Sequence, residues 1–334
     1  MGHFLVVGIL VIVMAVLTYV GLDAVGLMPV EASAQAVSID WLWNWQLITI
    51  SFLFSLIVVP LVYSLIVFRR KKGETGDGEH IEGNTPLEIA WTIIPLFIVL
   101  TFAYMGAYSL GQTRRVDPNA LVIEVKARQF AWTFEYPEYG IVSNELHIPV
   151  NKQVVLKMQS ADVIHSFWVP EFRVKQDVVP GRVTEYRITP TLIGDYKVRC
   201  AELCGRSHAY MESPVIVDSQ ADYTAWISEQ AAIAAEAAKT PEGQGKLLTV
   251  RNGCIGCHSL DGAKMTGPTW FNLYGEEVQL DNGTTVVADD AYIKESILDP
   301  KAKEVEGFAP TVMPGYPLTD EEIANIIAYL KTLK

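Results

Sequence analysis

The chain has 334 residues, half of them hydrophobic, and a formal net charge of −12 at pH 7. Its mean hydropathy is +0.22, which is unusual for a soluble protein that carries 38 acidic residues. The acidic balance gives no support for binding to nucleic acid and favours a basic partner. Length alone predicts two or three structural units.

Three uncharged apolar runs lie in the first third of the chain. They cover residues 4–22, 45–68 and 89–110, and each reaches the roughly 20 residues that cross a bilayer as a helix. One such run could be a buried core helix, but three of them indicate a membrane protein. We expect a transmembrane helical hairpin over residues 37–115.

The first 36 residues allow two interpretations. No Lys or Arg precedes the first run, which is weak for a signal peptide, yet Ala32, Ser33 and Ala34 are small residues of the kind that signal peptidase accepts. The segment is therefore either a retained helix or a signal peptide. The basic run at residues 69–72 follows the second span and predicts a cytoplasmic loop. The chain after the third span then lies on the outer face.

Alternating short runs at residues 121–125, 153–158 and 182–188 are typical of half-buried strands. Turn residues separate such runs, and we expect an antiparallel β-sandwich over residues 116–219. Residues 220–243 are predicted to form a helical tail and a linker. The remaining residues, 244–334, have the size of one small all-α domain.

A cluster of soft and borderline metal ligands follows one predicted strand. Cys200, Cys204, His208 and Met211 are spaced by four, four and three residues. Thiolate, imidazole and thioether together favour copper over the hard cations. A disulfide between the two cysteines and a zinc site are the alternatives, but a disulfide leaves the His and Met unexplained, and thioether is a poor zinc ligand. His165, at a strand end beside aromatic residues, supplies the missing nitrogen.

Two thiolates can bridge two copper ions. His165 and His208 would each bind one metal, while Met211 would complete one copper weakly and the backbone carbonyl of Glu202 the other. Sharing one electron over two metals and two sulfurs keeps bond-length changes small, which suits electron entry. His147 has no such loop near it, and we expect it to be a surface strand residue.

A second metal-type motif, Cys254-Ile-Gly-Cys257-His258, has the spacing that attaches a c-type haem. A thiol–disulfide motif is the alternative, but the adjacent His argues against it. Two methionines could be the sixth iron ligand, Met265 and Met313. We predict Met313, because a well-capped helix that begins near residue 319 would hold its loop over the iron. The domain resembles a small class I cytochrome c.

The rest of the chain, from about Trp41, resembles subunit II of the haem–copper cytochrome c oxidases. Three family motifs are met: Cys-x-Glu-x-Cys-x-x-x-His-x-x-Met, His-Ser-Phe-x-x-Pro and Glu-x-x-Trp-Thr-Ile-x-Pro. The matching positions are Cys200, Glu202, Cys204, His208 and Met211; His165, Ser166, Phe167 and Pro170; and Glu88, Trp91, Thr92, Ile93 and Pro95. The resemblance implies a cupredoxin-like sandwich that holds the dinuclear copper centre CuA.

Further roles are implied only by this resemblance. The carboxylate of Glu202 would reach a magnesium ion at the interface with the catalytic subunit, and Glu88 would stand at the entrance of a proton path, although a carboxylate there is more often a solvated helix-start residue. The family has Gln-Trp-x-Trp after its first strand, with the first Trp as the point of electron entry. Phe130 takes that place here, which leaves the electron-entry route open.

The fused cytochrome resembles the caa3 type of oxidase. Electrons would pass from a donor to haem c, to CuA and then to haem a of subunit I, where oxygen is reduced and protons are pumped. The donor could be a soluble cytochrome, a small copper protein or another respiratory complex. A CuA-containing nitric oxide reductase and a free-standing electron carrier are the alternatives. We expect a multi-pass protein of the bacterial cytoplasmic membrane, with both metal-binding domains outside.

Overall fold

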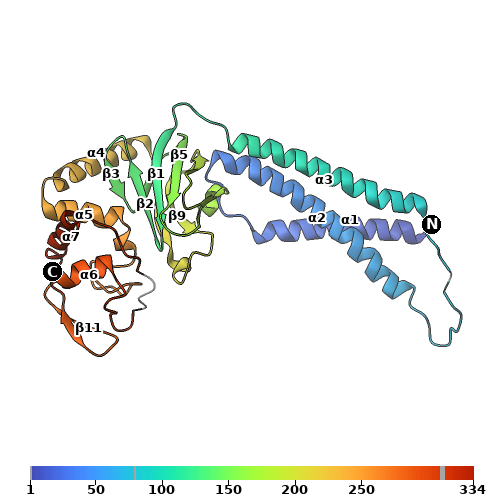
Figure 1. Cartoon of the computed structure of the whole chain (residues 1–334). Helices are drawn as coiled ribbons and strands as arrows, with labels where there is room; N and C mark the ends of the chain where they lie inside the picture. The colour runs from blue at the N-terminus through green and yellow to red at the C-terminus, as the bar shows by residue number, and fades with distance from the viewer. Residues whose placement is uncertain (1, 79, 309–312) are drawn as a thin grey trace. The chain divides into compact units, whose positions relative to one another are not determined.

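The computed structural model describes residues 2–78, 80–308 and 313–334. The chain divides into two compact units, Met1–Glu31 with Gln35–Arg115, and Ala32–Ala34 with Val116–Lys334. Figure 1 shows the helical first unit in blue to green and the second unit in green to red.

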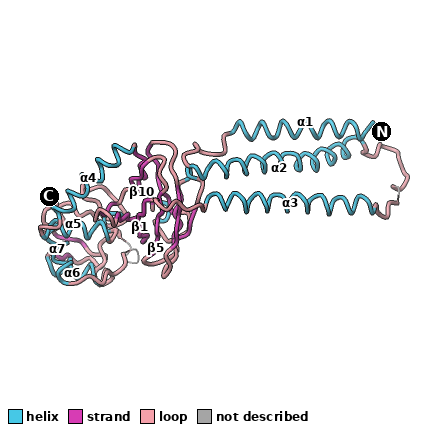
Figure 2. The backbone as a smooth tube through the Cα atoms, turned by 90° about the horizontal axis from the view of Figure 1, so that it is seen from above, coloured by secondary structure: helices cyan, strands magenta, loops and turns pink. Residues whose placement is uncertain are grey.

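The first unit consists of three long helices, α1 (Gly2–Val25), α2 (Ala34–Val67) and α3 (Thr85–Thr113). They lie side by side (Figure 2). Each is long and apolar enough to cross a membrane by length and composition, so all three predicted apolar runs form helices. The 34 residues of α2 measure about 50 Å, which exceeds the roughly 30 Å hydrocarbon core. This helix therefore reaches beyond the apolar layer.

Polar side chains pair the three helices. The Tyr19 hydroxyl donates to Asn44 Oδ1 at 3.0 Å, which joins α1 to α2, and the hydroxyls of Ser38 and Ser109 lie 3.2 Å apart between α2 and α3. Because hydroxyls and amides have no water to bind inside a bilayer, such pairs align neighbouring helices. Both pairs fit helices that run antiparallel to their neighbours.

The second unit contains a sandwich of two five-stranded sheets. One has the order β3-β2-β1-β5-β8 and the other β4-β10-β9-β6-β7. The strands are β1 (Leu121–Arg128), β2 (Ala131–Tyr136), β3 (Ile141–Ser143), β4 (Leu146–Pro149), β5 (Val154–Ser160), β6 (His165–Trp168), β7 (Lys175–Val178), β8 (Thr184–Ile188), β9 (Gly194–Cys200) and β10 (Glu212–Asp218). The predicted sandwich is confirmed.

The sheets are not purely antiparallel. β1 pairs in parallel with β5, and β4 in parallel with β10, while the other pairs are antiparallel. A parallel pair needs a long crossover between its strands, and here other strands fill those connections. Alternating hydrophobicity identifies the buried face of each strand but carries no information about which strand lies beside it.

The small residues before α2 belong to the folded β unit. Ala32 N donates to the Glu171 carbonyl at 3.1 Å, and Thr191 N donates to the Ala32 carbonyl at 3.0 Å. Ala32 and Ser33 are fully buried, and the Ser33 hydroxyl donates to the Phe172 carbonyl at 3.1 Å. Larger side chains would not fit at these two positions, which is a structural reason for the small residues there.

Helix α4 (Gln220–Ala237) corresponds to the predicted helical tail and packs beside β4 and β10. It covers His147, whose ring stacks on Trp226 with centroids 4.1 Å apart and whose Nδ1 lies 2.8 Å from Asp218 Oδ2. The interpretation of His147 as a surface residue was therefore wrong, because α4, which begins 73 residues later, covers most of its side chain and leaves it 12% exposed. Its place on a strand was correct.

The C-terminal part is helical, with α5 (Pro241–Arg251), α6 (Asp290–Leu298) and α7 (Asp320–Leu330). Helix α5 crosses α7 so closely that a Cβ on Gly245 would lie 2.0 Å from the Asn325 carbonyl oxygen. The capping box at the start of α7 is confirmed between Thr319 and Glu322. A small hairpin, β11 (Glu277–Gln279) and β12 (Thr285–Val287), was not predicted.

Candidate copper centre and haem site

Sheet pairing brings the predicted copper ligands together. Strand β6 begins with His165, β9 ends with Cys200, and the two strands pair with Phe167 opposite Cys200. The loop after β9 carries Cys204 and leads into a single 3-10 turn, His208–Tyr210. Residues 35 positions apart therefore meet at one end of the sheet.

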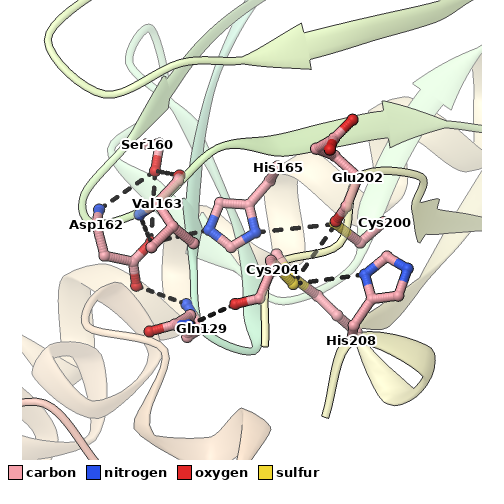
Figure 3. A network of polar contacts seen from close by, with 10 residues as sticks. Gln129, Ser160, Asp162, Val163, His165, Cys200, Glu202, Cys204 and His208 are labelled. Carbon is pink, nitrogen blue, oxygen red and sulfur yellow. Dashed lines mark hydrogen bonds and ion pairs between the residues drawn. The ribbon is translucent and has the colours of Figure 1, made fainter. Parts of the chain in front are cut away.

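The donor atoms form one compact group (Figure 3). His165 Nδ1 lies 3.8 Å from Cys200 Sγ, the two sulfurs are 3.8 Å apart, and His208 Nδ1 lies 3.5 Å from Cys204 Sγ. Met211 Sδ is 3.8 Å from Cys204 Sγ. Since a disulfide requires about 2.05 Å, both cysteines are free thiols.

Asp162 orients the buried histidine. Its Oδ1 lies 2.8 Å from His165 Nε2, so Nε2 carries the proton toward the carboxylate and Nδ1 faces the sulfurs. Burial raises the pKa of the Asp162 carboxyl, but hydrogen bonds from His165 and from backbone N–H groups outweigh it and the pKa is lowered. Burial lowers the pKa of His165, yet its bonds to Asp162 and Cys200 raise it overall.

The two thiols have opposite acid strengths. Burial raises the pKa of Cys200, but hydrogen bonds from His165 and from backbone N–H groups prevail and lower it to about 6. Burial and the neighbouring charge of Cys200 raise the pKa of Cys204 to about 12. The pair therefore holds one proton at neutral pH, which a soft metal bound by both sulfurs would displace.

Aromatic residues cover the site. Trp132 is buried, lies edge-on to His165 with ring centroids 6.2 Å apart, and donates from Nε1 to the Met211 carbonyl at 3.4 Å. Phe167 also lies edge-on to Trp132, with ring centroids 5.5 Å apart. These rings exclude water from the nitrogen and sulfur donors.

The two predicted carboxylates lie elsewhere. The Glu202 side chain is exposed and points away from the sulfurs, while its backbone carbonyl lies 3.2 Å from Cys200 Sγ. Glu88 lies in the first turn of α3, where its Oε1 accepts from Asn84 N at 3.2 Å. Glu88 thus completes a reciprocal cap of α3, since Asn84 Oδ1 accepts from Leu87 N.

The Cys-x-x-Cys-His segment lines an apolar cavity. Cys254 and Cys257 flank a 3-10 turn and both line the cavity with His258. His258 Nδ1 lies 2.7 Å from the Pro268 carbonyl oxygen, which fixes that nitrogen as the donor and leaves Nε2 for a ligand in the cavity. Burial lowers the pKa of His258, so the ring is neutral at pH 7 and fit to bind iron.

Met313 lines the same cavity as His258, whereas Met265 is not among its described lining residues and is 39% exposed. Apolar side chains from α6, α7 and their loops form most of the remaining wall, including Tyr292, Ile293, Ile297, Leu318, Ile326 and Leu330. Two thiols, a neutral imidazole and a thioether in an apolar cavity fit a haem attached through thioethers.

Sequence reasoning did not identify Asp162 or Gln129 as site residues. Asp162 Oδ2 accepts from Gln129 N at 2.8 Å, and the Gln129 side-chain amide donates to the Cys204 carbonyl. Asp162 lies three residues before a predicted ligand, which is a weak signal. Gln129 is distant from the ligands in sequence and only the fold places it there.

A copper-type donor group and a haem-type cavity on a chain with three membrane-anchoring helices define a membrane-bound electron-transfer protein. The sequence matches the family of cytochrome c oxidase subunit II in its periplasmic domain over residues 141–220 and in its transmembrane domain over residues 22–110, and it matches cytochrome c over residues 243–334. The chain belongs to the cytochrome c oxidase subunit II family and carries a C-terminal cytochrome c domain.

Named relatives agree with this assignment. Cytochrome c oxidase subunit 2 of Synechocystis sp. is 37% identical over 62% of this chain and 76% of its own length. The same subunit of Alkalihalophilus pseudofirmus is 32% identical over 88% of each chain. Among solved structures, the periplasmic domain of subunit II of cytochrome oxidase of Bradyrhizobium japonicum aligns with 32% identity and a TM-score of 0.32, over 34% of this chain and 96% of that one.

Proposed function

We propose that this protein is the electron-entry subunit of a caa3-type oxidase, which passes electrons from a donor through haem c and a dinuclear copper centre to haem a of subunit I. The single observation that carries the proposal is the coexistence, in one compact unit, of the Cys/His/Met donor group and the Cys-x-x-Cys-His cavity. Oxygen reduction and proton pumping belong to the catalytic subunit.

Each residue of the donor group would have its own role at the copper centre. Cys200 and Cys204 would bridge the two ions, and His165 and His208 would bind one each through Nδ1. Met211 and the Glu202 carbonyl would complete the coordination. A delocalised copper pair supplies one-electron transfer with little change in geometry. Asp162 holds the His165 ring, and Trp132 keeps water away from it.

In the haem cavity Cys254 and Cys257 would form the thioether bonds, with His258 and Met313 as axial ligands. A His/Met pair raises the reduction potential of a haem. The Pro268 carbonyl holds the His258 ring in the orientation that iron binding requires. The exposed Glu202 carboxylate would reach a magnesium ion at subunit I, and Glu88 would stand at a proton-path entrance, besides capping α3.

We further propose a bacterial cytoplasmic membrane as the location, with the β unit and the cytochrome domain on the outer face. The basic run after α2 supports this orientation, because Lys and Arg next to a span remain in the cytoplasm. The matched periplasmic family domain supports the same face. The immediate donor is a soluble cytochrome, a small copper protein or another respiratory complex.

Two alternatives predict a different composition of the purified complex. A nitric oxide reductase that uses a CuA subunit would contain the same chain beside B-type haem and non-haem iron. A free-standing carrier would purify without a catalytic subunit. A quinol oxidase subunit would lack the copper ligands, which this chain has.

Metal and haem analysis of the purified membrane complex tests the proposal. We expect two coppers and one covalently bound haem c in this chain, a near-infrared CuA band, and A-type haem in a co-purifying subunit. B-type haem with non-haem iron would support the nitric oxide reductase, and haem c without copper would refute the copper centre. Cys200→Ser should abolish the copper band and leave the haem c spectrum unchanged.

A further inference from the structure

The tip of the β1–β2 hairpin, residues 129–131, packs directly on the copper loop. The side-chain amide of Gln129 donates to the Cys204 carbonyl, as Figure 3 shows. A Cβ on Gly205 would lie 2.8 Å from Gln129 Nε2 and 3.0 Å from Phe130 Cζ. Only glycine at position 205 allows this close approach. Its φ of +139° is also a backbone angle that residues with a side chain rarely adopt.

The opposite side of the same tip packs on the haem-attachment segment. A Cβ on Gly256, between the two motif cysteines, would lie 2.6 Å from Ala131 Cβ, and one on Gly253 would lie 3.1 Å from the same atom. The Phe130 carbonyl oxygen lies 3.7 Å from the position that a Gly256 Cβ would take. Phe130 itself is only 6% exposed.

A ring of further contacts holds the two domains of this unit against each other around the tip. Arg128 lies over the Tyr316 ring at 4.5 Å from its centroid. The other contacts join the cytochrome domain to β2 and to the copper loop: Val250 O with Thr133 Oγ1 at 3.2 Å, Arg251 Nε with Glu135 Oε1 at 3.8 Å, and Thr266 Oγ1 with Ser207 Oγ at 3.3 Å.

Gln129 is tied to both sites. It lines the haem cavity, and its backbone N–H donates at 2.8 Å to Asp162, whose other oxygen holds His165. A short route therefore runs from the haem-attachment turn at Gly256 to Ala131, along the backbone to Gln129, and through its amide to the Cys204 carbonyl. The route bypasses any side chain at the position where the family has Trp.

We propose that the hairpin tip, residues 129–131, is the junction through which the cytochrome domain delivers electrons to the copper loop, and that Gln129 is the positioning residue that joins the two sides. This inference rests on the proposed function. One electron leaves the reduced haem iron and reduces the copper pair, while no bond or proton is transferred at the tip. The external donor named above replaces that electron.

The first test is Gln129→Leu in the purified, metal-loaded complex, which keeps the volume of the side chain but removes its amide. The haem-to-copper rate, followed after rapid reduction of the haem, should fall by up to about fivefold, because the loss of one net hydrogen bond lowers the population of the tip docked on the copper loop by up to that factor. Gln159→Leu is the matched control, because that side chain is exposed on β5, and its rate should not change.

Measurements on the same samples separate a positioning effect from damage to either centre. The copper content, the haem c spectrum and the reduction potentials of both centres should remain those of the unsubstituted protein in Gln129→Leu. Backbone amide exchange at residues 128–131 should become faster, because the tip loses a bond that holds it. An unchanged rate with intact centres would overturn the inference.

A rescue experiment tests the haem side of the tip. Gly256→Ala should slow haem-to-copper transfer, because its Cβ would collide with Ala131 Cβ at 2.6 Å. Ala131→Gly removes that atom and leaves the next contacts at 3.5 and 3.7 Å, so the double variant should recover the rate. Equal slowing in the single and double variants would mean that the contact with Ala131 does not carry the effect, which would overturn the inference.

The metal and haem content of the unsubstituted protein separates the junction from the proposed function. Absence of copper or haem c from the unsubstituted protein would refute the proposed function and the junction together. Both centres present, with a rate that Gln129→Leu does not change, would refute the junction alone.

Discussion

Asp162 illustrates how one carboxylate outside the predicted donor group determines the geometry of that group. One of its oxygens fixes the ring of His165 and the other holds the backbone of Gln129. Residues that hydrogen-bond metal-ligating histidines set both tautomer and orientation. The same carboxylate therefore connects the orientation of a copper ligand with the position of the hairpin tip.

Asp162→Ala should weaken copper retention by about 10- to 100-fold, the usual cost of losing such a partner. Competition with a chelator, read from the near-infrared copper band, measures it. Asp195→Ala is the control, because that side chain is exposed on β9. Copper retention that is equal in both variants would contradict the orienting role.

Copper loading should depend on pH through the thiols. At pH 8 Cys200, with a pKa of about 6, is ionised, while Cys204, with a pKa of about 12, still holds its proton. Copper displaces that proton, so the apparent affinity should rise at least about tenfold per pH unit near pH 8. Titration of the copper-free protein at pH 7.5, 8 and 8.5 tests this, and an affinity independent of pH would contradict it.

The two methionines of the cytochrome domain should respond differently to substitution. Met313→His should lower the haem potential by on the order of 0.1 V, within the roughly 0.8 V range that axial ligands set. Met265→His should leave it unchanged, because Met265 is absent from the described lining of the cavity. Potentiometric titration with visible spectra decides, and the reverse pattern would make Met265 the ligand.

At the scale of elements, the segment before α2 contributes to the core of the β unit. Ala32 and Ser33 are buried beside the loop that contains Phe172, and backbone bonds tie the segment to residues 171, 189 and 191. The small side chains at these positions are therefore compatible both with a signal-peptidase site and with close packing in the core. Packing provides a reason for them without any processing.

Ala32→Asp should lower the free energy of unfolding of the β unit by about 3 kcal/mol or more, because it buries a charge without a partner. Ala34→Asp is the matched control, since the Ala34 side chain is exposed, and its change should be within about 0.5 kcal/mol. Loss of the copper band on heating or in denaturant measures both. Equal effects would show that position 32 is not buried.

At the scale of the whole molecule, the cytochrome domain covers the hairpin tip on the copper-binding sandwich. Phe130 is nearly inaccessible there, packed next to Gly205. A freely diffusing donor thus has no access to the copper through this residue. We expect such a donor to reduce the haem first.

Rapid mixing of the purified complex with a reduced soluble cytochrome c tests the order of reduction. The haem c absorbance should change before the near-infrared copper band, and Gln129→Leu should lengthen the delay between them. Reduction of the copper before the haem would show that the donor reaches the copper directly.

Much of the site could be predicted from the sequence because its residues lie close together along the chain. The spacings of Cys200, Cys204, His208 and Met211, and of Cys254, Cys257 and His258, are local, and one loop can bring each set to one point. The membrane helices could be predicted equally well from the sequence, since about 20 consecutive apolar residues suffice to identify a span. Alternating hydrophobicity likewise predicted the sandwich.

The contacts made across the fold were decided by tertiary structure alone. The parallel strand pairs, the contact of His147 with α4 and the position of Gln129 between two sites all join residues that are far apart in the sequence. Their signals depend on which surfaces pack together, and hydrophobic periodicity specifies only that a face is buried. The sequence by itself thus determined the chemistry of the two centres, whereas the tertiary structure decided how they are connected, because close packing between distant segments has no local signature.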